Sequence, residues 1–146
     1  MKRAFALLAV VLLLGADSKD DVKKDRKKLE GTWQVVTEVV DGNDRPEDEV
    51  KNLKVFFDAD GNWRAENDGK VIFKGTSVID PSKKPKEIDE TITTGPNKGK
   101  VFSAIYEIDD DHHKICFAAS GKGRPTAFSS LNGSGHLLQV WKREKK

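Results

Sequence analysis

The densest group of potential metal ligands in this sequence is the DDDHH run at Asp109–His113. Carboxylate and imidazole side chains together are typical ligands of zinc and related metals. Adjacent histidines on a strand point to opposite faces, so His112 and His113 cannot readily bind one ion. The three aspartates also lack the spaced oxygen ligands and the helices of a calcium-binding loop. The pattern favours a solvated turn, and we expect neither a metal nor another cofactor.

Two glycine-rich segments are the next candidates for chemistry. Ser134, in NGSGH, lacks the Gly-x-Ser-x-Gly spacing of a hydrolase nucleophile and leads into a strand pattern. GKGRP, which contains Arg124, lacks the full phosphate-loop spacing and opens no helix. We expect Arg124 to fix a loop by pairing with a carboxylate or with backbone carbonyls, and contact with an anionic ligand is the alternative.

The single cysteine, Cys116, excludes a disulfide within the chain. It lies in the apolar stretch KICFA, which predicts a buried and unreactive thiol. A reactive thiol would need a cationic partner, and the nearby histidines are weak support for one. Because no paired acid and base stands out, we name no catalytic residue and expect a protein that is not an enzyme.

The elements that must position these residues are short strands. Runs of alternating apolar and polar residues, separated by Asp, Asn and Gly, indicate antiparallel strands joined by tight turns. We predict strands over residues 32–40, 53–58, 62–66, 70–80, 87–94, 101–108, 114–119, 125–131 and 136–144. One short helix is expected within residues 45–53, where a proline precedes three acidic residues.

Eight or nine strands at this spacing predict an all-β fold, either a sandwich or a closed up-and-down barrel. Short connections favour the antiparallel barrel, and closure also removes exposed sheet edges. In the first strand, alternation places Trp33, Val35, Thr37 and Val39 on one face and Gln34 and Glu38 on the other.

Five aromatic residues lie on faces that are expected to point into the barrel: Phe57, Trp63, Phe73, Phe102 and Tyr106. A buried tyrosine needs a hydrogen-bond partner, which is either a neighbouring side chain or a bound molecule. On the strand at 87–94, Ile88 and Ile92 share one face. Burial of these isoleucines would leave Asp89, Thr91 and Thr93 on the surface, and the opposite orientation would give a polar patch in a cavity.

The N-terminus has the pattern of a secretory signal peptide, predicted at residues 1–16. Lys2 and Arg3 precede an apolar run that is too short to span a membrane, and cleavage is expected near Ala16 or Ser18. The mature protein would therefore be periplasmic or extracellular, without a membrane span. Residues 17–28 are expected to form a charged, flexible or frayed helical spacer before a single domain at 29–146.

Charge excludes a nucleic-acid binder. The chain has 26 Lys and Arg residues against 24 Asp and Glu, and loss of Lys2 and Arg3 makes the two counts equal. The remaining charges are interspersed, whereas binding to nucleic acid requires a basic face.

Gly31-Thr32-Trp33, near the start of the domain, resembles the Gly-x-Trp signature of lipocalins and related calycin barrels. The wider sequence is similar to a family of small secreted domains that is abundant in planctomycetes and has no established activity. The similar segments are LEGTW, the DG of VVDGN, DPSKKPKEID, GPNKGK, IYEI, ICFA, GKGRPTAFSS, GSGHLL and KRE. The chain departs from that family at DDDHHK and at Ala118-Ala119-Ser120.

This resemblance implies a lipocalin-like barrel with Trp33 closing one end. Arg143 stands where the family places an arginine across the indole ring, and Gly31 lets the chain enter the barrel closely. The expected function is to hold a small, mainly apolar ligand, with Trp63 and Tyr106 as the best contacts. The alternative is an envelope interaction module whose barrel is filled by side chains, with an unknown protein partner.

Overall fold

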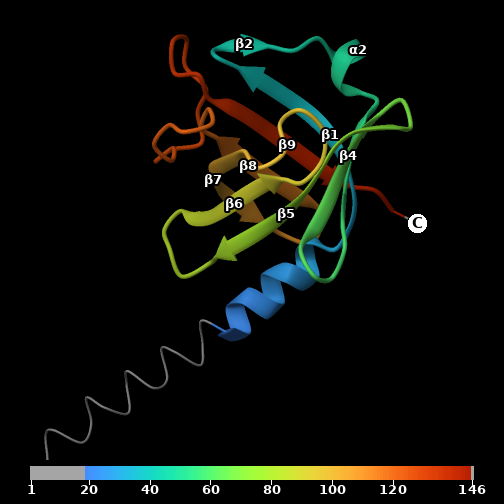
Figure 1. The fold of residues 1–146 in the computed structure, drawn as a ribbon, viewed down its shortest axis with the longest axis vertical. Coiled ribbons are helices and arrows are strands. Elements are labelled where there is room, and N and C mark those ends of the chain that lie inside the picture. Colours follow the sequence, from blue (N-terminus) through green and yellow to red (C-terminus); the bar gives the residue numbers. More distant parts are fainter. Residues whose placement is uncertain (1–18, 146) are drawn as a thin grey trace, which may run out of the picture.

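The computed structural model describes residues 19–145, so the predicted signal peptide lies outside the described residues. Eight antiparallel strands form a closed barrel, because β1 pairs with both β3 and β9. The strands are β1 (Gly31–Val40), β3 (Leu53–Phe57), β4 (Asn62–Asn67), β5 (Lys70–Asp80), β6 (Lys86–Ile92), β7 (Val101–Ile108), β8 (His112–Phe117) and β9 (Leu137–Arg143). The predicted all-β antiparallel barrel is confirmed (Figure 1).

Two small elements lie outside the barrel wall. The two-residue strand β2 (Asn43–Asp44) pairs with the end of β1. The helix α2 (Glu47–Val50) follows Pro46, has three acidic residues in its first turn and buries Val50. The short helix that we predicted within 45–53 is therefore present.

The predicted strand at 125–131 is wrong. Residues 118–136 form a long irregular connection between β8 and β9. Pro125 cannot donate a backbone hydrogen bond to a sheet, and the neighbouring Arg124 ties the connection to the outside of the barrel. Cys116 lies beneath this connection, and its thiol is 3.4 Å from the Ser129 carbonyl oxygen. The predicted burial of the thiol is confirmed, and burial raises its pKa.

The first strand contains a β-bulge that the alternation did not predict. The register of β1 against β9 shifts between Val35 and Thr37. Beyond the shift the two faces exchange, so Thr37 is exposed and Glu38 is buried. The predicted faces therefore hold for Trp33 and Val35 and fail after them, because one extra residue inverts every later side chain.

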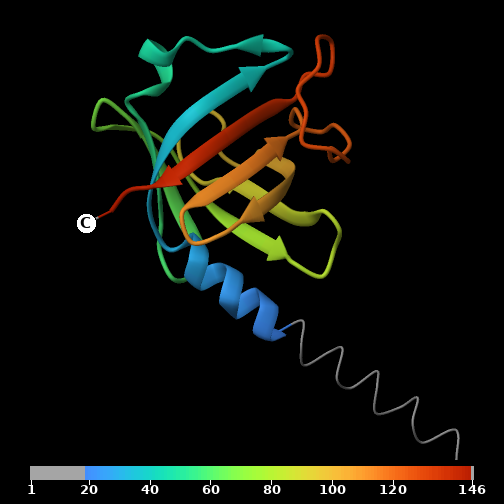
Figure 2. The same ribbon diagram turned by 180° about the vertical axis from the view of Figure 1, so that it is seen from behind.

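A helix that includes residues 19–29 lies across the end of the barrel where β1 begins (Figures 1 and 2). We call this the helix end, and we call the opposite end, where β1 ends and β9 begins, the far end. Asp25 and Leu29 of this helix are buried, and Val22 packs against the core. Residues 19–28 of the segment that we expected to be a charged, flexible or frayed helical spacer are helical, and they dock on the barrel. No helix within residues 19–145 is long and apolar enough to cross a membrane.

Candidate functional site

Arg143 lies across Trp33 at the helix end, with its Cζ atom 4.2 Å from the centre of the ring. The same guanidinium donates to the carbonyl oxygens of Lys28, Glu30 and Asp110, which joins the end of the helix to the β7–β8 turn. Gly31 has a φ of 124°, and a Cβ there would lie 3.0 Å from the guanidinium. This close approach explains the glycine.

The interior tryptophans donate their N–H groups to the chain itself. Trp33 donates to the Leu29 carbonyl at 2.8 Å, and Trp63 donates to the Thr76 carbonyl at 3.2 Å. Trp141 donates to Gln139 at 2.9 Å. These donors need no ligand, so the tryptophan expected to contact one, Trp63, is a core residue that is 8% exposed.

The remaining predicted aromatic contacts are spread over the barrel. Phe57 is buried, and Phe102 packs against the core while partly exposed. Phe73 pairs with Ala65, which packs against the core, so it lies on the inward face as expected, but it is 41% exposed. It precedes Gly75, the first residue of β5 that pairs with β6, so β6 does not cover it.

Arg124 lies against the outer wall of β6 and β7. It donates to the carbonyl oxygens of Ile88 and Ala104, at 3.1 and 2.8 Å, and to Asp89 at 2.7 Å. The loop-fixing role that we expected is therefore present, and these partners occupy the guanidinium. Ile88 is buried, which leaves Asp89 on the outer face, as expected from the burial of the isoleucines.

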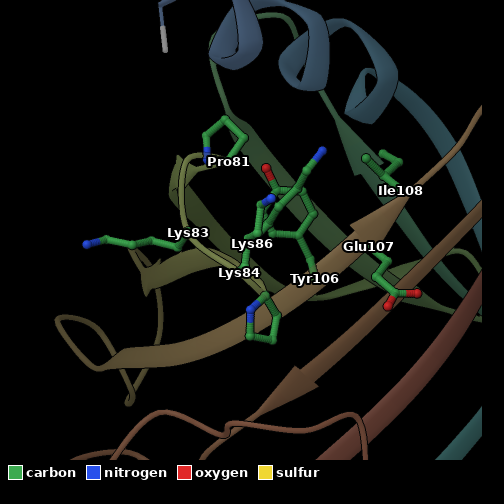
Figure 3. A pocket seen from close by; sticks show the side chains of 8 residues that line it. Pro81, Lys83, Lys84, Lys86, Tyr106, Glu107 and Ile108 are labelled. Atoms are coloured by element: carbon green, nitrogen blue, oxygen red, sulfur yellow. The ribbon is translucent and has the colours of Figure 1, made fainter. Parts of the chain in front are cut away.

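Tyr106, one of the predicted contacts, borders a hollow. The hollow has a volume of about 340 Å³ and lies at the helix end, beside the β5–β6 connection. Pro81, Pro85 and Ile108 give it apolar walls, and Lys83, Lys84, Lys86, Tyr106 and Glu107 complete the lining. In Figure 3 the Tyr106 hydroxyl points towards the helix, whereas the Lys83 side chain extends away from the ring.

The partner of the Tyr106 hydroxyl is Asp25. Tyr106 donates to Oδ2 of Asp25 at 2.7 Å, and Lys86 Nζ donates to the same oxygen at 2.9 Å. Asp25 is 4% exposed, and its carboxylate forms an ion pair with Lys86. A buried charge needs such a partner. Burial, and then the hydrogen bond to Asp25, raise the pKa of Tyr106, which therefore remains a donor.

Arg26, the neighbour of Asp25, makes a second polar contact with the barrel. It donates to the hydroxyl and the backbone carbonyl of Ser77 on β5. Nothing in the charged run DSKDDVKKDRKK distinguishes Asp25 and Arg26 from the exposed residues beside them. Asp25 and Arg26 could not be identified from the sequence, because their burial depends on where the helix docks.

Glu90 and His113 are buried polar groups that we did not predict, although the sequence carried a signal for Glu90. Glu90 lies between Ile88 and Ile92 on the inward face of β6, and its Oε1 has no hydrogen-bond partner within residues 19–145. Burial raises the pKa of Glu90 to about 8, so the carboxyl is protonated at neutral pH. Alternation alone would have placed Glu90 inside.

His113 is the other buried polar group. Its ring is enclosed by Trp141, Trp33 and Tyr106, at centroid distances of 4.5, 5.7 and 6.0 Å, and neither nitrogen has a partner in the described part of the chain. Burial, with a smaller contribution from Arg143, lowers its pKa to about 3, so the ring is neutral. His112 is exposed, so the two histidines do point to opposite faces. Residues 19–145 contain no group of three or more potential ligands that could hold a metal.

Comparisons with known proteins give no family for this chain. No protein-family model and no curated protein matches it. A solved structure that is similar in part is a DUF4847 family protein from Bacteroides vulgatus, with 14% sequence identity and a TM-score of 0.48. The match covers 81% of this chain and 95% of that one, and a likeness at this level says nothing about function.

Proposed function

We propose that this protein is an exported, non-enzymatic binding protein that holds a small, mainly apolar ligand at the helix end of its barrel. The hollow beside Tyr106 carries the proposal. Its volume of about 340 Å³ lies at the lower end of the range for small-molecule sites. Pro81, Pro85 and Ile108 give it apolar walls, and its charged and polar lining residues could orient a bound molecule.

The sequence led us to expect a ligand in the barrel mouth, in contact with Trp63 and Tyr106, and the proposed site keeps only Tyr106 of these two. Phe57 and Trp63 pack in the core, and the tryptophan N–H groups bond within the chain. A ligand between these side chains would have to displace packed groups, and protein interiors tolerate this poorly. A ligand in the hollow at the helix end leaves these core side chains in place.

A ligand titration tests the proposal. The mature protein would be titrated with a library of lipophilic small molecules, with tryptophan fluorescence and melting temperature as readouts. Ile108→Arg should abolish binding because it fills the hollow, whereas Val78→Arg, at a position that is 68% exposed, should bind as the wild type does. Failure of every compound to bind a folded wild-type protein would overturn the proposal.

A protein-interaction module with a filled barrel is the second candidate, and one observation favours it. Val71, Ile72 and Phe73 are consecutive and 41–48% exposed at the start of β5. Consecutive exposed apolar residues are typical of contact surfaces. Under this alternative, a pull-down with the Val78→Lys variant should still recover a partner protein from the cell envelope. The Ile72→Lys variant should fold but should not recover this partner.

A further inference from the structure

The buried carboxylate at the helix end comes from outside the barrel, whereas both of its donors come from the barrel wall. Tyr106 belongs to β7 and Lys86 to β6. Their donor atoms lie 2.7 and 2.9 Å from a single oxygen of Asp25. The barrel therefore contains a formed cradle for one carboxylate, and the N-terminal helix fills it. We call Tyr106 and Lys86 the carboxylate cradle.

The cradle and the hollow share their residues. Tyr106 and Lys86 both line the hollow, next to the apolar walls at Pro81 and Ile108. In Figure 3 the tyrosine ring lies among the labelled lining residues, with its hydroxyl directed at the helix. A molecule with its carboxylate in the place of Asp25 could lay its apolar part along these walls. Lys83 and Lys84, exposed at the rim, would attract the anion.

The helix is held most firmly at its C-terminal end, and towards its N-terminus it is held mainly by polar contacts. At its C-terminal end Leu29 is buried, and Arg143 and Trp33 bond the carbonyls of residues 28–30. Towards its N-terminus the contacts are the partly buried Val22, the cradle, and the bond from Arg26 to Ser77. A helix this short is marginal without tertiary contacts, so loss of the Asp25 contact would favour release of the N-terminal part.

From this arrangement we propose that the carboxylate cradle binds the head group of a small carboxylate with an apolar tail, and that Asp25 occupies it as an internal competitor until such a ligand displaces the helix. The inference rests on the proposed function and names its ligand class. An alkyl carboxylate meets both requirements, because its head can accept from the phenol and the ammonium while its tail contacts the prolines and Ile108.

The test compares decanoate with decanol, which has the same alkyl chain and no carboxylate. Calorimetric titration of the wild-type mature protein should show tighter binding of decanoate than of decanol. Asp25→Asn should bind decanoate more tightly than the wild type by about tenfold, because the competing charge is removed. Asp21→Asn, the same change at an exposed position of the helix, should leave the affinity unchanged.

Two further measurements keep the test independent of the folding of one variant. Tyr106→Phe keeps the ring and should remove most of the preference for decanoate over decanol. In the wild type, decanoate should increase amide hydrogen exchange of residues 19–27 and leave that of the β-strands unchanged, because only the helix is displaced.

The outcomes separate the two proposals. Equal binding of decanoate and decanol, or an Asp25→Asn affinity equal to that of the wild type, would overturn the carboxylate cradle and leave a ligand-binding protein. If neither decanoate, decanol nor any library compound binds, the proposed function itself fails and the inference fails with it.

Discussion

Two buried carboxyl groups of this protein have different surroundings. At the helix end, Asp25 is buried and bonded to two donors from the wall. On the inward face of β6, Glu90 is similarly buried, but its Oε1 has no hydrogen-bond partner within the described residues. A paired buried charge holds elements together, whereas an unpaired one becomes neutral and costs stability when it must ionise. The contact between the helix and the barrel is therefore built from paired groups, whereas Glu90 and His113 are buried titratable groups with unpartnered atoms in residues 19–145.

The apolar residues differ between the two ends of the barrel. Phe57, at the helix end, is 5% exposed, whereas Phe73, towards the far end, is 41% exposed. Phe57→Ala should lower the free energy of unfolding by about 3–5 kcal/mol because it leaves a cavity. Phe73→Ala should cost less than about 1 kcal/mol. Urea denaturation of both variants measures this difference, and similar losses for the two would contradict the contrast between the ends.

Because of Glu90, the free energy of unfolding should fall as the pH rises above 6.5. In the unfolded chain its carboxyl ionises near pH 4.5, whereas in the folded protein it stays protonated to about pH 8. The unfolded state therefore binds fewer protons in this window, and stability falls as pH rises. From pH 6.5 to 8 the loss should total about 2 kcal/mol, at 1.4 kcal/mol per pH unit. Glu90→Gln should remove this slope in denaturant titrations at each pH.

His113 should have the opposite effect at acid pH, where the free energy of unfolding should fall as the pH falls. Its unfolded pKa is 6.5 and its folded pKa is about 3, so the unfolded state binds more protons and stability falls as pH falls. Between pH 4.5 and 6.5 the two slopes cancel, and below pH 4.5 His113 should cost about 2 kcal/mol by pH 3. His113→Phe keeps a ring and should lose this contribution. An unchanged acid slope in that variant would show that the ring is not the cause.

Arg143 tests how the helix is joined to the barrel, and it has the smallest expected effect. Arg143→Lys keeps the charge but cannot reproduce the planar set of bonds to Lys28, Glu30 and Asp110. We expect a loss of about 1–2 kcal/mol in the free energy of unfolding. Amide hydrogen exchange should rise first near residues 28–31. Lys142→Arg, at an exposed position beside it, is the control and should change neither quantity.

Most of the barrel could be predicted from the sequence, since alternation and glycine-rich turns are local signals. They predicted all eight strands of the wall and the helix near residue 47. The prediction failed at 125–131, where an apolar stretch covers the outside of the barrel, and at Glu38, because a bulge leaves no mark on composition. The sequence does carry a signal for the burial of Glu90, since Glu90 alternates with two isoleucines.

The sequence by itself favoured a closed antiparallel barrel. It also indicated that Gly31 and Trp33 lie where the first strand begins. It placed Ile88 and Ile92 on one face of the strand at 87–94, and the structure shows that this face points inward. These features depend on neighbours along the chain. Tertiary structure alone decided that Asp25 would be buried and that Tyr106 and Lys86 would meet it across more than sixty residues. Such a contact depends on where a helix docks, and this depends on the shape of a surface that exists only after the strands have closed.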